Sequence, residues 1–105
     1  MTREKTFQQS IITTARLLGW HHFAVRDSRG CPPGWPDLVL VHPDRGVRYR
    51  ELKTDYGRLS PEQEAWGELL TRAGCDWAVW RPSDWSQIEA ELRGQLAISG
   101  ERVLG

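Results

Sequence analysis

The chain has 105 residues, 39% of them hydrophobic and 27% charged, and its formal net charge is zero. This composition is typical of a globular domain rather than a disordered chain, and the balanced charge argues against binding polyanions by overall attraction. The length supports one hydrophobic core, so we expect a single domain over residues 1–105, with its core at about 4–97 and a loose tail at 98–105. The apolar runs are too short for a membrane-spanning helix, and the amino terminus lacks the pattern of a signal peptide. Both observations favour a cytoplasmic protein.

The first predicted element is a helix over residues 4–18. Its apolar side chains recur at helical intervals, and Gly19 stands where a helix-terminating glycine is expected. Residues 22–26 contain a Phe-Ala-Val run, which predicts a short strand. The segment 27–34 is rich in glycine and proline, which interrupt regular structure, so a long loop is expected here. Long ordered loops often carry function.

Two strands that form a hairpin follow this loop. Residues 37–41 are an apolar run with one acid at its start, and residues 47–52 form the returning strand. The segment 43–46 between them contains the proline, aspartate and glycine that tight turns favour. The hairpin places the start of the first strand beside the end of the second.

A second helix is predicted from Pro61 to Ala73. Ser60 suits the N-cap, Pro61 suits the first helical position, and Gln63 can complete a capping box with Ser60. Gly74 supplies the stop. The expected apolar stripe of this helix consists of Ala65, Trp66, Leu69, Leu70 and Ala73.

The last elements are a strand at 75–80 and a helix that opens at Pro82. The order αβββαβα predicts an α/β fold, a small mixed sheet flanked by helices. Four tryptophans are expected in the core: Trp66, Trp77, Trp80 and Trp85. Trp20 and Trp35 are left open, because Trp35 lies in the loop before Asp37 and could stack on a base or pack a dimer.

Three charged residues of the hairpin carry the predicted chemistry. Asp37 begins the first strand, and Glu51 and Lys53 end the second. Residues two apart in a strand point to the same side, so Glu51 and Lys53 share a face, roughly 6.6 Å apart along the chain. Pairing of the strands brings Asp37 near Glu51. Two carboxylates are therefore expected to meet beside one ammonium group.

This arrangement suits phosphodiester hydrolysis with a hard divalent cation. The reaction develops negative charge on phosphate oxygens and needs hydroxide at neutral pH, and Mg²⁺ bound by one or two carboxylates meets both needs. We predict that Asp37 and Glu51 bind the ion, with the backbone carbonyl of Leu52 as a third ligand. Lys53 is expected to orient the attacking water and stabilise the transition state by its charge, rather than to act as a general base.

Four segments of the chain together resemble a known family. They are Gly34-Trp35-Pro36-Asp37, Glu51-Leu52-Lys53, the run from Gly57 to Gln63, and Trp80-Arg81-Pro82. They are similar to the stand-alone VRR-NUC domains of phages and bacteria, in the PD-(D/E)xK nuclease superfamily, and the similarity covers roughly residues 4 to 92. The resemblance implies a restriction-endonuclease-like αβββαβ core and dependence on Mg²⁺ or Mn²⁺. It also implies structure-selective cleavage of branched or junction DNA by a homodimer, in a bacterial or phage-infected cell.

The resemblance also points to residues beside the metal ion. Gln63 matches a glutamine that lies near the metal in these domains, whereas the residues alone explain it as the capping partner of Ser60. An acid is usual in the first helix of the family, and two positions fit it: Glu4 in one register and Gln8 in another. If Gln8 holds the position, an amide has replaced a metal ligand.

Basic residues gather around the hairpin. Between positions 45 and 58, five basic residues stand against two acids, which gives a local net charge of +3. The predicted DNA contacts are Arg26, Arg29, Trp35, Arg48, Arg50 and Arg58. Arg48 and Arg50 could instead form a solvated strand face, and Arg26 and Arg29 could simply keep their loop soluble.

Two other classes of function stay open on the same fold. A catalytically inactive DNA-binding module would keep the basic residues but would not need Asp37, Glu51 and Lys53. A protein-interaction module would use exposed tryptophans and would bind neither polyanions nor metal. Salt-dependent DNA binding separates these two classes. The residues do not distinguish DNA from RNA as the substrate of a nuclease.

Overall fold

The computed structural model describes residues 4–25 and 30–95, with side chains from residue 6 onward. The predicted tail at 98–105 lies outside the described residues. The elements are α1 (Glu4–Leu17), β1 (His21–Ala24), β2 (Leu38–His42), β3 (Gly46–Leu52), α2 (Pro61–Arg72), β4 (Asp76–Trp80), the 3₁₀ turn η2 (Pro82–Asp84) and α3 (Trp85–Leu92). The predicted order of helices and strands is confirmed, with bounds shifted by a few residues. Among the described residues, no helix is long and apolar enough to cross a membrane.

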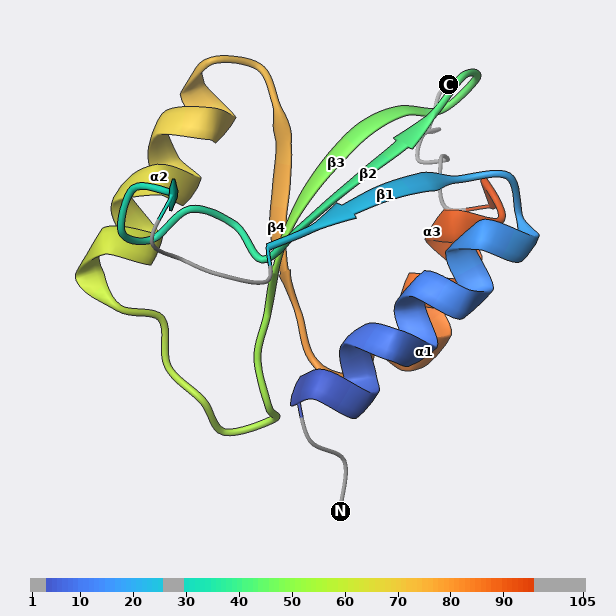
Figure 1. Cartoon of the computed structure of the whole chain (residues 1–105), viewed down its shortest axis with the longest axis horizontal. Helices are drawn as coiled ribbons and strands as arrows, with labels where there is room; N and C mark the ends of the chain where they lie inside the picture. Colours follow the sequence, from blue (N-terminus) through green and yellow to red (C-terminus); the bar gives the residue numbers. More distant parts are fainter. Residues whose placement is uncertain (1–3, 26–29, 96–105) are drawn as a thin grey trace, which may run out of the picture.

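The four strands form one mixed sheet in the order β1-β2-β3-β4 (Figure 1). β2 pairs antiparallel with β1 and β3, and β4 pairs in parallel with β3. The turn between β2 and β3 closes with a hydrogen bond from the Arg45 N–H to the His42 carbonyl, and Gly46 there takes a φ of 88°, which favours glycine. Parallel pairing requires a crossover connection, and α2 provides it between β3 and β4. The predicted α/β fold with a small mixed sheet is confirmed.

Helices cover the two faces of the sheet unequally. α1 and α3 lie on one side of the strands and α2 on the other (Figure 1). The main core lies between the sheet and the α1–α3 pair. Its buried residues are Phe7, Ile11, Ile12, Ala15, Trp20, Leu38, Leu40, Leu52, Trp80, Ile88 and Leu92. Because side chains alternate along a strand, the residues next to Leu38, Leu40 and Leu52 face the α2 side.

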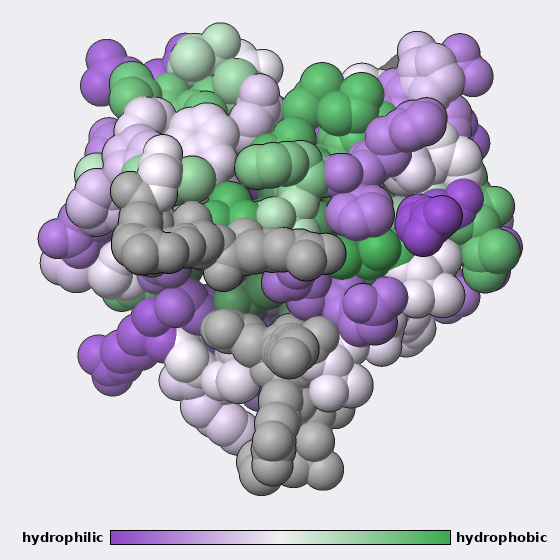
Figure 2. Space-filling model, viewed as in Figure 1, coloured by the Kyte–Doolittle hydropathy of each residue, from purple (hydrophilic) through white to green (hydrophobic). Residues whose placement is uncertain are grey.

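The face of β1, β2 and β3 on the α2 side is only partly covered. Strand alternation places Phe23, Val41 and Val47 on it, and their exposed fractions are 61%, 42% and 38%. Figure 2 shows hydrophobic residues gathered near the middle of the view. Contiguous exposed apolar surface of this kind often marks an interaction site.

The amino terminus of α2 is capped as predicted. Ser60 Oγ accepts a hydrogen bond from the Gln63 N–H at 3.1 Å, and Gln63 Oε1 accepts one from the Ser60 N–H at 2.8 Å. The predicted apolar stripe of this helix is wrong in part, because Leu69 is 57% exposed and the buried residues of α2 are Gly67 and Leu70. A Cβ at Gly67 would collide with the Trp77 ring, so close approach of α2 to β4 depends on this glycine.

Burial of the tryptophans differs from the prediction. Trp80 is buried as expected, but Trp66, Trp77 and Trp85 are only partly buried. Trp20, which the sequence left open, lies in the core, and its indole N–H donates to the Leu92 carbonyl at 2.9 Å. This bond joins the chain just before β1 to the end of α3.

Candidate active site

Asp37 and Glu51 lie opposite each other at the open end of the β2–β3 hairpin. Leu38 pairs with Arg50, and continuing this register by one residue sets Asp37 against Glu51. Directly opposed residues in an antiparallel pair point to the same face with Cβ atoms about 4.5–5.5 Å apart. The hairpin therefore brings these two carboxylates together.

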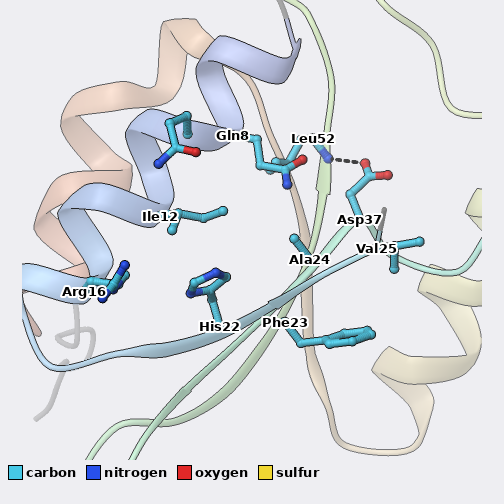
Figure 3. Close-up of a pocket in the computed structure, with 10 residues that line it drawn as sticks. Gln8, Ile12, Arg16, His22, Phe23, Ala24, Val25, Asp37 and Leu52 are labelled. Atoms are coloured by element: carbon cyan, nitrogen blue, oxygen red, sulfur yellow. Dashed lines mark hydrogen bonds between the residues drawn. The ribbon is translucent and has the colours of Figure 1, made fainter. Parts of the chain in front are cut away.

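The end of β3 holds Asp37 in place. Its Oδ2 accepts a hydrogen bond from the Leu52 N–H at 2.9 Å, drawn as a dashed line in Figure 3. The next N–H, that of Lys53, donates to the Trp80 carbonyl in β4. Because C=O and N–H point in opposite directions across a trans peptide, the Leu52 carbonyl points away from β4, toward the Asp37 side. The structure thus places the predicted third ligand beside Asp37.

Glu51 is fully buried and receives a hydrogen bond from α2. Gln63 Nε2 donates to Glu51 Oε1 at 3.3 Å. Since Gln63 Oε1 is occupied by the Ser60 N–H, the amide of Gln63 can present only its NH₂ group to Glu51. The sequence left open whether Gln63 caps the helix or lies near the site. In the structure it makes both contacts at once, so the capping box orients the donor that reaches Glu51.

The loop before Asp37 packs against the first turn of α2. Gly34 has a φ of 87°, and a Cβ there would collide with the backbone of Glu62. The Trp35 ring packs edge-on against Trp66, with ring centroids 5.1 Å apart, and against Tyr49 at 6.2 Å. Trp35 therefore packs the loop against α2 and β3.

Lys53 begins the loop after β3, and Arg81, the residue that follows β4, binds this loop. The N–H of Lys53 donates to the Trp80 carbonyl at 3.1 Å, which continues the parallel pairing and keeps the side chain on the Glu51 side. Arg81 donates to the carbonyls of Thr54 at 2.6 Å and Gly57 at 2.7 Å. Sequence reasoning missed this clamp, although Arg81 belongs to one of the segments that carried the family resemblance.

A cleft of about 1130 Å³ opens beside Asp37 between α1 and β1. Gln8 and Leu52 line it together with Asp37, and Figure 3 shows the Gln8 amide directed toward them. Gln8, one of the two candidate positions in the first helix, lines the cleft beside Asp37. The side chain of Glu4 lies outside the described part of the chain.

Arg48 and Arg50 face away from this site, into an ion-pair network below α3. Arg50 is 2% exposed and pairs with Asp76 at 3.0 Å and with Glu91, and its guanidinium lies over the Trp80 ring. Arg48 pairs with the same acids at 3.3 and 3.1 Å. The prediction that Arg50 contacts DNA is wrong, and so is the alternative that it belongs to a solvated face, because its side chain is buried. Arg48 is partly exposed, so its contact with DNA stays a prediction, although its charge is already paired with Asp76 and Glu91.

The other predicted DNA contacts have different outcomes. Arg58 is exposed in the connection between β3 and α2, so its contact with DNA stays a prediction. Arg26 and Arg29 lie outside the described residues.

The candidate metal ligands around Asp37 are oxygen atoms. They comprise the Asp37 and Glu51 carboxylates, the Leu52 carbonyl and the amide oxygen of Gln8. In the described part of the chain, no group of three or more His, Cys, Asp or Glu side chains is placed to hold a metal ion. An all-oxygen set with two carboxylates fits a hard cation such as Mg²⁺ or Mn²⁺ better than zinc.

Comparisons with known proteins agree with this fold. The family model of the VRR-NUC domain matches residues 3–84, which include all four resembling segments. A solved VRR-NUC domain structure is similar with a TM-score of 0.68 and 20% identity, over 85% of this chain and 92% of that chain. The Holliday junction resolvase Hjc of Archaeoglobus fulgidus is matched with a TM-score of 0.49 and 22% identity, over 72% and 66% of the two chains. Curated proteins yield no match.

Proposed function

Because the chain belongs to the VRR-NUC domain family, we propose that it is an endonuclease that hydrolyses DNA phosphodiester bonds. The observation that carries the proposal is the register that opposes Asp37 and Glu51 at the open end of the hairpin, with Lys53 as the first residue after β3. Membership in the family points to a nuclease, and placement in the PD-(D/E)xK superfamily is consistent with these residues. Phosphodiester hydrolysis is the chemistry that two carboxylates and an ammonium group best support.

Mg²⁺, which Mn²⁺ can replace, is the proposed cofactor. Asp37, Glu51 and the Leu52 carbonyl would hold it, with the Gln8 amide nearby. Two carboxylates that oppose each other repel, and a cation between Asp37 and Glu51 would offset that repulsion. When bound, it would neutralise the phosphate and lower the pKa of a coordinated water.

The chain's own residues position the reacting groups. The Leu52 N–H fixes Asp37, and the Gln63 amide fixes Glu51. The ammonium group of Lys53, on the Glu51 side of the strand, orients the attacking water and stabilises negative charge that develops on the phosphate. Because these hydrogen bonds exist before substrate binds, little reorganisation is needed during the reaction.

The proposed substrate is branched or junction DNA, and the proposed active form is a homodimer. The family resemblance supports both, and the expected site of action is the cytoplasm of a bacterial or phage-infected cell. The partly uncovered face with Phe23, Val41 and Val47 gives a second copy an apolar surface to pack on. Light scattering after gel filtration should give about twice the 12.1 kDa of one chain, and Phe23→Lys should halve that mass. A monomeric wild type would contradict the homodimer.

The test of the proposed function is cleavage of labelled duplex, flap and four-way junction DNA in Mg²⁺ or in EDTA. Wild type should cut in Mg²⁺ only, most rapidly at the branched substrates. Asp37→Ala, Glu51→Ala and Lys53→Ala should each lose the activity. Cleavage that persists in EDTA would contradict the mechanism, and salt-dependent binding without cleavage in Mg²⁺ would favour an inactive DNA-binding module.

A further inference from the structure

The cleft beside Asp37 extends along α1 from Gln8 to Arg16. Gln8, Ile12 and Arg16 line it at intervals of four residues, which places them on one face of the helix. At 1.5 Å per residue, Gln8 and Arg16 are about 12 Å apart along the helix axis. Figure 3 shows Gln8 at the Asp37 end of this row and Arg16 at the other end. The cleft therefore leads away from the candidate active site in one direction.

The opposite wall of the cleft is the edge of the sheet. β1 is the terminal strand of the described sheet. The Val25 N–H donates to the Asp37 carbonyl, so the backbone groups of alternate residues, His22 and Ala24, point away from β2. Both residues line the cleft, and the His22 ring points toward α1 (Figure 3). Edge-strand N–H groups of this kind are available to a ligand.

Four side chains of this lining carry hydrogen-bond donors. Arg16 is exposed in the last turn of α1, and Gln8, Gln9 and His22 add side-chain donors. Among the described lining residues, the one acid is Asp37, at the proposed metal site. Donors that lie between the proposed metal site and an arginine suit a chain of phosphate groups. It also provides the local polyanion site that a chain of zero net charge requires.

We propose that this cleft holds the sugar–phosphate backbone of the cut strand on one side of the scissile phosphate, with Arg16 as a phosphate contact. This inference rests on the proposed endonuclease function and deepens it. A length of about 12 Å along the cleft spans only a few phosphates of one strand. Arg16 therefore contacts a phosphate a few nucleotides from the one cut beside Asp37, and His22 lies along the path between them.

The first test is DNA binding in EDTA, measured by fluorescence anisotropy over a range of salt concentrations. The variants are Arg16→Gln and, as a matched control, Arg72→Gln. Both arginines are exposed in the last turn of a helix, but Arg72 lies on α2, across the sheet from the cleft. Arg16→Gln should weaken binding about tenfold at low salt and lower the slope of log affinity against log salt by about one. Arg72→Gln should change the affinity by less than about twofold.

A second test replaces single DNA phosphates with neutral methylphosphonates. Wild type should lose affinity when the phosphate bound by Arg16 is neutralised, and Arg16→Gln should show no further loss at that position, because the two changes remove one interaction. Two results would overturn the assignment: equal DNA affinity of Arg16→Gln and wild type, or the same dependence of affinity on the position of the methylphosphonate in both proteins.

Failure of this inference can be separated from failure of the proposed function. Binding is measured without metal, so a wild type that binds through Arg16 but does not cleave in Mg²⁺ would overturn the endonuclease and leave the cleft assignment standing. If wild type cleaves in Mg²⁺ and Arg16→Gln binds DNA as tightly as wild type, the cleft assignment is overturned and the endonuclease stands. No DNA binding by wild type would overturn both.

Discussion

Arg50 and Glu51 are consecutive residues of β3, both almost wholly buried, and they project to opposite faces of the sheet. On the α3 side, Arg50 is surrounded by Asp76, Glu91 and the Trp80 ring, so its charge is matched by fixed partners. On the α2 side, the hydrogen bonds that position Asp37 and Glu51 come from a backbone N–H and an amide.

If the proposed function is correct, buried charge serves two purposes in this strand. A closed ion-pair network contributes to packing, and removal of one partner is strongly destabilising. Under the proposed function, the hydrogen bonds to Asp37 and Glu51 support a metal site, as hydrogen bonds to metal-binding carboxylates do in other proteins. Substitutions on the α3 side should therefore change stability, and substitutions on the α2 side should change activity.

The largest expected effect follows from removing charge at the carboxylate pair. Asp37→Asn and Glu51→Gln keep the shape of the side chains, so the free energy of unfolding in urea should change by less than about 1 kcal/mol. Cleavage of junction DNA in Mg²⁺ should fall by at least about 10²–10³-fold. If either variant cleaved as rapidly as wild type, the proposal of an active site on the α2 side of β3 would be contradicted.

Arg50→Ala should show the opposite pattern. It removes a buried side chain that packs on the Trp80 ring and leaves Asp76 and Glu91 paired with Arg48 alone, so the free energy of unfolding should fall by about 3–5 kcal/mol. The matched control is Arg93→Ala, which removes an exposed pair with Glu89, and its effect should stay below about 0.5 kcal/mol. Equal unfolding midpoints for the two variants would contradict a structural role for the Arg50 network.

Gly34 tests the contact between the Asp37 loop and α2. Gly34→Ala combines a positive φ with a collision against Glu62, whereas Gly74→Ala has a φ of 91° and open space. Gly74→Ala should cost about 1–2 kcal/mol. Gly34→Ala should cost more and should also slow cleavage, because the loop and the first turn of α2 must separate. Similar stability and activity in the two variants would show that the close approach is unimportant.

The smallest expected effect concerns the two halves of the capping box. Ser60→Ala and Gln63→Ala each remove one capping hydrogen bond, and each should cost about 1 kcal/mol of stability. Only Gln63→Ala also removes the contact with Glu51. It should weaken Mn²⁺ binding, measured by calorimetry, by about tenfold, with little change in Ser60→Ala. Equal metal affinity in both variants would limit Gln63 to capping.

The sequence predicted best those features that depend on neighbouring residues. Ser60 and Gln63 are three residues apart, so their capping box could be recognised locally and is confirmed. The turn between β2 and β3 fixes the register by its own geometry, and this register opposes Asp37 and Glu51. The family resemblance rested on the same short segments.

Features that depend on distant residues could not be predicted in the same way. Arg48 and Arg50 look like surface residues of a strand, because Glu91, which pairs with both, lies on α3 about forty residues later. Trp20 lies in the core, where its indole N–H donates a hydrogen bond to the carbonyl of Leu92, 72 residues away. The exposed side of α2 could not be identified either, since close contact at Gly67, rather than a wide apolar stripe, joins the helix to β4.

The most direct test of the central claim is a crystal structure of the protein grown with Mn²⁺, with anomalous scattering recorded near the manganese edge. We predict an anomalous peak bound by carboxylate oxygens of Asp37 and Glu51 and by the Leu52 carbonyl, at distances of about 2.0–2.4 Å. In Glu51→Gln crystals grown in the same way, the peak should be absent or much weaker. A wild-type structure with no peak between Asp37 and Glu51, or with Mn²⁺ bound only elsewhere, would contradict the account.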